Sequence, residues 1–363
     1  MADRIHLRII CSRQHSASQG HDLLAYYLGR SSWKVSGWQG TLGQRLIARM
    51  LRWLPRHQRR RPALVYHLAL ANWYSRFGFV HLIWGDYLIE FIDRPERCIL
   101  TLHQPYESWS EGHWERIGRC AGVVCMAERE CLKIRQRYPS LPCVFIPHGV
   151  DTSFWRNLPL PPKRQICAVG RHLRNFEMLV RVARLLLDRH PDLSFFWVVN
   201  PDFKIPPSLV SMLPTERFTV LRNLSAEDLH RLYVESWLFC TPYDNVAASN
   251  AIVESMASGT PVFTTRVGGM SSYGDTGVIT MVDNNDDAAM VEAVTHCLGS
   301  PELRAKLSAN GREHALQNFR WSEVVEAHEA FYRLVGEVRT DAAQVRKPAK
   351  TANSPRPFVP SRD

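Results

Sequence analysis

The stretch Ser249-Asn-Ala-Ile-Val-Glu254-Ser-Met-Ala-Ser-Gly259-Thr-Pro261-Val decides the fold. It follows a Pro-Tyr-Asp-Asn loop and predicts a helix that carries Glu254 early in its length. Gly259 and Pro261 end that helix, because glycine is favoured just past a helix end and proline cannot continue one. The apolar run that follows, residues 261–265, predicts a buried strand. The stretch therefore predicts a helix that leads directly into a strand.

The same alternation of helices and strands runs along most of the chain. The predicted strands are residues 5–11, 98–102, 123–126, 143–146, 166–169, 194–199, 218–221, 237–240, 261–265 and 278–282. From residue 98 on, these runs are apolar throughout, as in strands covered on both faces. Helices are predicted at residues 21–28 and 176–190, the second from apolar side chains spaced along one helix face. Alternating strands and helices predict βαβ units and parallel sheets.

The prolines of Asn157-Leu-Pro-Leu-Pro-Pro-Lys-Arg164 predict a break between two domains, because proline fixes φ and removes a backbone donor. We therefore expect an α/β protein with two doubly wound, Rossmann-like domains that face each other across a cleft. The expected divisions are an N-terminal domain at 1–156, a linker at 157–164, a second domain at 165–318, a C-terminal helix at 319–338 and a disordered tail at 339–363. Ligands of such sheets bind beyond the carboxyl ends of the strands.

Composition and charge limit the classes of function. The chain has 363 residues, 45% of them hydrophobic, and no apolar run long enough to span a membrane. The charged start and nine cysteines without a Cys-x-x-Cys pair predict a cytoplasmic protein with reduced, buried thiols. No spacing of metal ligands stands out, and the absence of Gly-x-Gly-x-x-Gly and Walker A sequences argues against dehydrogenases and kinases. The net charge of +10 favours anionic partners.

Four motifs in a fixed order resemble those of one enzyme family. They are Pro147-His-Gly-Val-Asp151, Val169-Gly-Arg171, the stretch from Ser249 to Pro261 quoted above, and Val267-Gly-Gly269. In this order they resemble the retaining glycosyltransferases of GT-B fold, of the group 1 or family 4 type, over residues 123–338. The resemblance implies transfer of a sugar, with retention and without metal or cofactor, from a nucleotide-diphosphate sugar to a hydroxyl acceptor such as a glycolipid or polysaccharide. It also implies that the C-terminal helix crosses back to the N-terminal domain.

The resemblance further implies roles for particular residues. Cations suit a diphosphate, and the turn after the strand at 166–169 carries Arg171 and Arg174, which would hold the donor phosphates. Glu254 would accept hydrogen bonds from the two ribose hydroxyls. His103 would lie beside the donor sugar, so His103 and Arg171 are the expected catalytic residues. The remaining expected donor contacts are Gly20, Gly170, Asn223, Ser249 and Asn250, of which the last two are also typical helix N-caps.

One position departs from the family pattern. A glutamate is expected eight residues before Glu254, where this chain has Val246, whose side chain cannot hydrogen-bond a sugar. Asp244 and Asn245 are alternatives for a sugar contact, and the backbone amides near Ala247 are another. The departure leaves two rival functions open, a GT-B nucleotide-sugar epimerase or hydrolase and a non-catalytic nucleotide-sugar-binding relative.

A basic segment precedes these motifs. Residues 42–54 carry apolar side chains along one side and Arg45, Arg49 and Arg52 on a neighbouring stripe, with Trp53 near the end. Such a segment predicts either a peripheral helix on an anionic membrane, at its inner face, or an ordinary domain helix with a solvated arginine face. No nucleic-acid-binding module accompanies these charges, so nucleic acid is not an expected partner.

Overall fold

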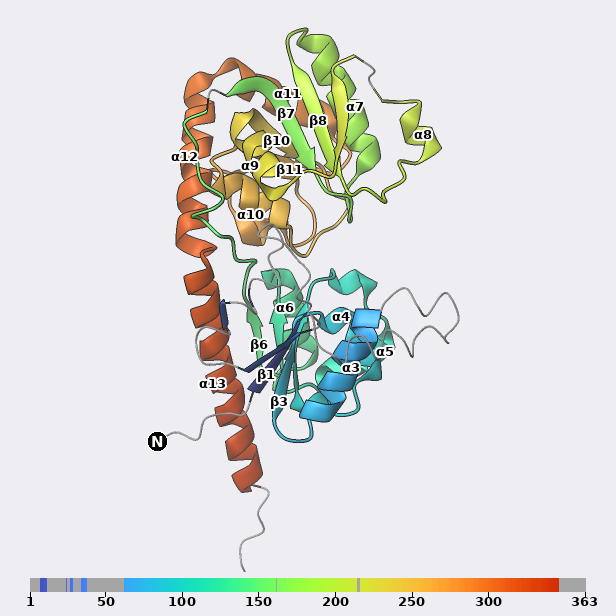
Figure 1. Cartoon of the computed structure of the whole chain (residues 1–363), viewed down its shortest axis with the longest axis vertical. Helices are drawn as coiled ribbons and strands as arrows, with labels where there is room; N and C mark the ends of the chain where they lie inside the picture. Colours follow the sequence, from blue (N-terminus) through green and yellow to red (C-terminus); the bar gives the residue numbers. More distant parts are fainter. Residues whose placement is uncertain are drawn as a thin grey trace, which may run out of the picture.

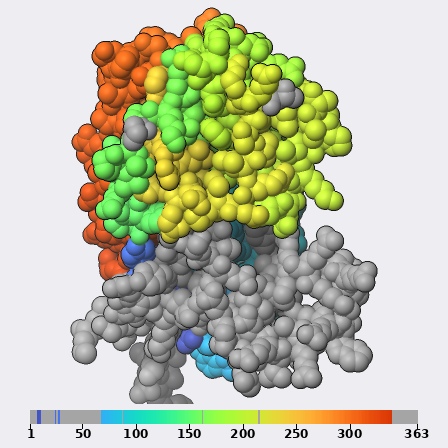
Figure 2. Space-filling view, turned by 45° about the horizontal axis from the view of Figure 1, so that its top comes forward, coloured from blue at the N-terminus to red at the C-terminus, as the bar shows by residue number. Residues whose placement is uncertain are grey.

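The computed structural model describes residues 7–11, 24, 27, 28, 34–37, 62–160, 162–213 and 216–345. They form two α/β domains, one above the other in Figure 1, with two successive helices, Pro301–Asn318 and Trp321–Val345, along one side of both. Each domain is built on a six-stranded parallel sheet. In Figure 2 the orange residues of the C-terminal helices run down one side of the molecule from the second domain toward the first. The predicted arrangement of two doubly wound domains is confirmed.

The N-terminal sheet has the order β2-β1-β3-β4-β5-β6. Its strands are β1 (Leu7–Cys11), β2 (Lys34–Gly37), β3 (Phe79–Leu82), β4 (Cys98–Leu102), β5 (Gly122–Cys125) and β6 (Cys143–Phe145). Its helices are α3 (Pro62–Tyr74), α4 (Gly85–Leu88), α5 (Glu111–Gly118) and α6 (Glu128–Arg137), with short 3-10 turns at Ile89–Phe91, Pro95–Arg97 and Tyr106–Ser108. The sequence patterns do not predict β2, β3 or α3.

The sheet of the second domain has the order β12-β11-β10-β7-β8-β9. Its strands are β7 (Lys163–Val169), β8 (Ser194–Val199), β9 (Phe218–Arg222), β10 (Ser236–Thr241), β11 (Val262–Thr265) and β12 (Ile279–Val282). Its helices are α7 (Phe176–Arg189), α8 (Pro207–Val210), α9 (Ala226–Glu235), α10 (Asn250–Ala257), α11 (Asp287–Gly299) and α12 (Pro301–Asn318), with a 3-10 turn at Met270–Tyr273. Every strand predicted from residue 98 on is present, each end within three residues of its predicted position.

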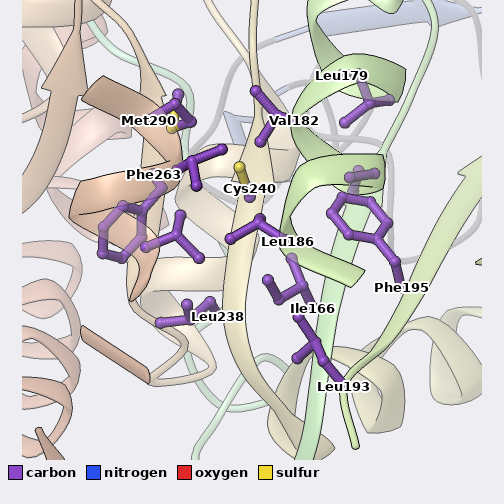
Figure 3. Close-up of a cluster of buried hydrophobic side chains, with 14 of the residues drawn as sticks. Ile166, Leu179, Val182, Leu186, Leu193, Phe195, Leu238, Cys240, Phe263 and Met290 are labelled. Atoms are coloured by element: carbon purple, nitrogen blue, oxygen red, sulfur yellow. The ribbon is translucent and has the colours of Figure 1, made fainter. Parts of the chain in front are cut away.

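Helix α7 shows why the second domain folds as its sequence predicts. Asn175 is the N-cap, and its side-chain oxygen accepts a hydrogen bond from the backbone N–H of Met178 at 2.9 Å. The apolar face of the helix then packs on the sheet, and Figure 3 shows Val182 and Leu186 beside Cys240 and other strand residues. Each such buried aliphatic side chain contributes roughly 1.5–3 kcal/mol relative to an exposed one. This packing also holds β7, the strand that precedes the helix, with its carboxyl end toward the other domain.

The last helix, α13 (Trp321–Val345), ties the two domains together. Its residues Trp321, Phe331 and Val335 are buried with apolar side chains of β1, β4 and β5 in the N-terminal domain. A Cβ atom at Gly122 would lie 2.9 Å from both Phe331 and Val335, so the helix approaches β5 this closely only because residue 122 is glycine. The crossing that the family resemblance implies is therefore present.

Three expectations about the chain's divisions need adjustment. Helix α13 continues to Val345, so the disorder expected from residue 339 is wrong for residues 339–345. Strand β7 begins at Lys163, inside the expected linker. The expected helix at 21–28 lies mostly outside the described residues, as do Gly20 and the basic segment with Arg45, Arg49, Arg52 and Trp53. No helix within the described ranges has both the length and the apolar composition needed to cross a membrane.

Candidate functional site

A cleft of about 550 Å³ lies between the two domains. Its walls come from the loops that follow β3, β4, β7, β8 and β9 and from the start of α10. Eight of the residues expected at the site line this cleft: His103, Gly170, Arg171, Arg174, Asn223, Ser249, Asn250 and Glu254. The structure thus brings together residues that are spread over about 150 positions of sequence, because parallel strands all end at the same edge of a sheet.

The turn after β7 carries two arginines with different roles. Gly170 has a φ of +98°, and a Cβ atom there would lie 2.6 Å from Nη2 of Arg174, so the turn requires glycine. Arg174 folds back over this turn and donates to the carbonyls of Val169 at 3.0 Å and His172 at 2.7 Å. Arg171 is exposed in the cleft, and its guanidinium makes no hydrogen bond with the residues the structure describes. Arg171 is therefore the free cation of this turn, and Arg174 mainly shapes it.

Glu254 lies in the first turns of α10 with its carboxyl group toward the cleft. The residue is 6% exposed, and its Oε2 accepts a hydrogen bond from the Tyr233 hydroxyl at 3.5 Å. Burial disfavours the charged form and raises the pKa of Glu254 to about 8. The carboxyl group is thus poorly solvated and weakly bonded, which suits it to accept donors from a ligand.

The start of α10 adds further polar groups to the cleft wall. Ser249 is the N-cap residue by position, yet its hydroxyl caps no backbone N–H; it accepts a hydrogen bond from the Tyr243 hydroxyl at 2.6 Å. The Oδ1 atom of Asn250 is buried and has no hydrogen-bond partner among the described residues. The alternative interpretation of Ser249 as an N-cap is therefore confirmed by its position, although its side chain makes no capping bond. The helix N-terminus, with its positive end of the dipole, faces the cleft.

A mostly apolar pocket forms one end of the cleft. It is lined by Val198, Val199, Pro201, Leu224 and Leu229, together with Asn200 and Asn223. Asn223 has a φ of +57°, which turns the chain sharply after β9. A flat, partly apolar group such as a nucleobase fits a pocket of this composition.

His103 forms the opposite wall, from the N-terminal domain. Its Nε2 donates to the carbonyl of Ile83 at 2.5 Å, and burial lowers its pKa to about 4. The imidazole is therefore neutral with its proton on Nε2. The backbone N–H groups of His103 and Gln104 donate to the carboxylate of Asp86 at 2.6 and 3.2 Å, although burial raises the pKa of Asp86 to about 6. Asp86 thus fixes the loop that carries His103.

Sequence reasoning missed two residues that line the cleft, Trp84 and His148, and one buried residue that does not line it, Asp86. Trp84 packs against His103 with ring centroids 4.8 Å apart, and Asp86 holds the loop described above. Both follow β3 as His103 follows β4, but the sequence patterns do not predict β3, so they give no signal for these two residues. His148, from the Pro147–Asp151 motif, lines the cleft with its ring 6.0 Å from that of His103 and nearly parallel to it.

The structure does not bring the two alternative sugar contacts into the cleft. Asp244 is exposed, and its side chain accepts from Asn284 at 3.4 Å. Asn245 donates to Glu107 of the N-terminal domain at 3.3 Å and accepts from the N–H of Val246 at 2.8 Å. The side chain of Val246 is buried in the core, and its carbonyl accepts from the N–H of Gly269. Residues 244–246 therefore lie beside the cleft, and the loop reaches the cleft wall only at Ala248.

The sequence shows no cluster of metal ligands, and here the structure differs. Within the described ranges, Cys125, Cys131 and Cys143 form the one convergent group of three or more His, Cys, Asp or Glu side chains. None of them lines the cleft. Their spacing, with five and eleven intervening residues, follows no common metal motif, so only the fold brings them together.

Comparison with known proteins identifies part of the chain. Residues 163–300 match the family described as "Glycosyl transferases group 1". The second domain is a group 1 glycosyltransferase domain. The matched residues contain β7 through α11 and therefore include Arg171, Asn223 and Glu254 of the cleft.

Relatives of known sequence and structure extend this result. The chain is 27% identical over 193 residues to the MMP alpha-(1->4)-mannosyltransferase of Mycolicibacterium hassiacum, covering 52% of this chain and 47% of that one. It thus spans about half the length of the curated relatives it matches. In structure it is similar to sucrose-phosphate synthase of Thermosynechococcus elongatus, with a TM-score of 0.68, 17% identity and coverage of 94% and 100% of the two chains. It is also similar to the Anabaena protein HepE in complex with UDP and glucose, with a TM-score of 0.68, 14% identity and coverage of 90% and 100%. The glycosyltransferase domain is therefore part of a chain with the GT-B fold.

The burial of Glu254 predicts a stability that depends on pH. The folded pKa of about 8 lies above the ordinary value of 4.5, so between these values the unfolded chain ionises while the folded chain keeps its proton. Over this range each pH unit lowers the free energy of unfolding by up to about 1.4 kcal/mol. The melting temperature of Glu254→Gln, relative to that of the wild type, should therefore increase as the pH rises from about 5 to about 8. Above about pH 8 the difference between the two melting temperatures should stay constant.

The control for this comparison is Glu177→Gln, which changes an exposed glutamate of α7. Its difference from the wild type should stay flat across the same pH range. A flat difference for Glu254→Gln as well would contradict the buried, protonated state of that carboxyl group.

Proposed function

We propose that this protein is a glycosyltransferase that moves a sugar from a nucleoside-diphosphate sugar to a hydroxyl group of an acceptor. The observation that carries the proposal is the convergence on one cleft of the buried carboxyl of Glu254, the guanidinium of Arg171, which has no partner in the described part of the chain, and the N-terminus of α10. These groups match the ribose diol and the diphosphate of such a donor. The complex of the similar HepE protein with UDP and glucose supports the same donor class.

In the proposed complex the donor lies along the second domain. The nucleobase enters the pocket of Val198, Leu224 and neighbouring residues, and the ribose hydroxyls donate to Glu254. Binding then favours the carboxylate form, since two hydroxyl donors replace the water that burial removes. The diphosphate lies between Arg171 and the start of α10, which offers Ser249 and Asn250 as further contacts.

The chemistry proposed for the cleft is stabilisation of the leaving diphosphate. Arg171 and the dipole of α10 neutralise the charge that develops as the bond to the sugar breaks, without need of a metal ion. Neutral His103 and the ring of Trp84 form the wall where the sugar and the acceptor would meet. Closure of the two domains around them excludes water, which favours transfer over hydrolysis. We propose that the sugar keeps its anomeric configuration.

Val246 makes a non-catalytic relative the rival to exclude, with an epimerase or hydrolase as the second. The side chain of Val246 has no polar atom and is buried, so it offers no hydrogen bond to the sugar. Backbone groups of the same loop can take that role, since Ala248 does line the cleft. Turnover therefore has to be tested together with binding.

The proposal predicts nucleotide binding that depends on two side chains. A panel of UDP, GDP, ADP, CDP and dTDP, with magnesium or with chelator, is tested for thermal stabilisation. At a ligand concentration of 100 times the dissociation constant, the folded state gains about 2.7 kcal/mol, which is readily measured. One diphosphate should stabilise the wild type equally with and without magnesium, and should stabilise Glu254→Ala and Arg171→Ala much less.

Turnover of the corresponding sugar nucleotide completes the test. Removal of the Arg171 guanidinium should cost about 2–4 kcal/mol of transition-state stabilisation, visible as lost transfer to an acceptor. The control is Arg189→Ala, an exposed arginine at the far end of α7, which should behave as the wild type. Binding without transfer or hydrolysis would favour the non-catalytic relative, and no binding of any diphosphate would contradict the proposal.

We further propose that the protein works in the cytoplasm and contacts an anionic membrane through its N-terminal domain. Besides the basic segment at 42–54, three aromatic side chains on adjoining elements are more than half exposed: Trp73 (55%), Phe77 (69%) and Phe91 (57%). The Asn72 side chain donates to the backbone carbonyl of Phe91 at 3.2 Å, which places α3 and that turn side by side. Aromatic and basic side chains together suit the interface of an anionic bilayer.

Vesicle binding tests this surface. Binding to vesicles that contain anionic lipid should weaken as salt rises, because salt screens the arginine charges. It should also weaken in Trp73→Ser with Phe77→Ser, and in the triple change of Arg45, Arg49 and Arg52 to Glu. The control is Leu185→Ser, a 46% exposed leucine on α7 of the other domain. Equal binding by all variants would contradict the membrane contact.

A further inference from the structure

Three thiols meet inside the N-terminal domain, away from the cleft. Cys125 ends β5, Cys131 lies in α6 and Cys143 begins β6. The sulfur of Cys143 is 3.1 Å from that of Cys131 and 3.7 Å from that of Cys125, and all three sulfurs lie within 4.8 Å of one another. Their side chains come from three consecutive elements of one βαβ unit, so the fold itself sets their distances.

The arrangement differs from that of a neighbouring buried cysteine in the same apolar cluster. Cys98 directs its thiol to a backbone carbonyl, that of Arg94, at 3.4 Å. The three clustered thiols have one another as partners, together with the carbonyl of Cys131, which lies 4.0 Å from the sulfur of Cys143. Ordinary packing of a small apolar side chain explains Cys98, but it gives no reason for three sulfurs to converge on one point.

We propose that Cys125, Cys131 and Cys143 form a binding site for a thiophilic d10 metal ion, zinc(II) or copper(I). Bonds of about 2.3 Å from a metal to each thiolate place the sulfurs of one site roughly 3.8–4.0 Å apart. The pair Cys125 and Cys143, at 3.7 Å, is already near that separation. The closer pair, Cys131 and Cys143, reaches this separation through a small rotation of the Cys131 side chain.

The surroundings fit a soft cation held by sulfur alone. The three residues are buried among apolar side chains that include Ile117, Ile134 and Leu141. Three thiolates with one divalent ion carry a net charge of −1, and the Arg135 guanidinium, which donates to the carbonyl of Cys143 at 2.8 Å, supplies the compensating charge. Thiolate ligands select copper(I) and zinc over the harder magnesium and calcium ions.

A bound ion would fasten α6 to two strands of the sheet. The first residues of α6 also contact the second domain, since the N–H of Glu128 donates to the Ser272 hydroxyl at 3.0 Å. Just before the helix, the carbonyl of Met126 accepts from the Tyr273 hydroxyl at 2.9 Å. The site would therefore stiffen the N-terminal side of the contact between the domains. It does not depend on the nature of the reaction in the cleft.

The test is metal binding by the full chain. Protein freed of metal with chelator and reductant is titrated, without oxygen, with zinc(II) or cadmium(II) in one arm and with copper(I) in the other. Readouts are the metal content per chain after desalting, the charge-transfer absorption from thiolate to metal, and the melting temperature. We expect one ion per chain in at least one arm, with charge-transfer absorption and a raised melting temperature, and the arm that succeeds names the ion.

Variants separate the cluster from other cysteines. Cys131→Ser and Cys143→Ser should each weaken binding by more than the roughly 10–100-fold that loss of an outer-shell partner costs. Cys98→Ser, in the same core, should bind as the wild type. No stoichiometric uptake by the wild type in either arm overturns the proposal, whether or not a variant folds. Equal uptake by Cys143→Ser and Cys98→Ser, or a Cys131–Cys143 disulfide whose reduction restores no metal binding, also overturns it.

Discussion

A carboxyl group held out of water either finds donors and cations or keeps its proton, and Glu254 keeps its proton. Within the described residues its one hydrogen bond comes from the Tyr233 hydroxyl, at 3.5 Å, and burial raises its pKa to about 8. A ligand with two adjacent hydroxyl groups supplies the hydrogen-bond donors that the protein itself does not provide. On the proposed function the cleft binds a diol, and this constraint explains why a buried glutamate stands where an apolar residue would be more stable.

The rest of the fold places the other groups around that carboxyl. Parallel strands in each domain end at the cleft, so Gly170 with its arginine turn and His103 with its loop face each other. Helix α13 holds the domains together, and hydrogen bonds cross between them from His172 to Gln104 at 3.2 Å and from Asn245 to Glu107 at 3.3 Å. The spacing of the two walls is thus set by the packing of α13 and by hydrogen bonds at and beside the cleft, as the exclusion of water in the proposed reaction requires.

The sequence predicts the second domain well and the first domain poorly, for a physical reason. Apolar strands and the stretch around Glu254 are local signals, and the structure confirms the strands and the helix that they predict. The roles of Trp84 and Asp86 depend on where β3 ends, and a histidine, His81, interrupts the apolar run of β3, so its pattern does not predict a strand. The inward fold of Arg174 depends on the positive φ of Gly170, and no pattern of residue types reports a dihedral angle. The three cysteines are far apart in sequence and meet only through the βαβ unit.

The most direct test of the account is whether Glu254 recognises the ribose diol. Binding of the preferred nucleoside diphosphate and of its 2′,3′-dideoxy analogue is measured by calorimetry on the wild type and on Glu254→Gln. The account predicts that the wild type strongly prefers the natural ribose, that most of this preference disappears in the variant, and that the dideoxy analogue binds both proteins about equally. A preference for the natural ribose that is unchanged in Glu254→Gln would contradict the account.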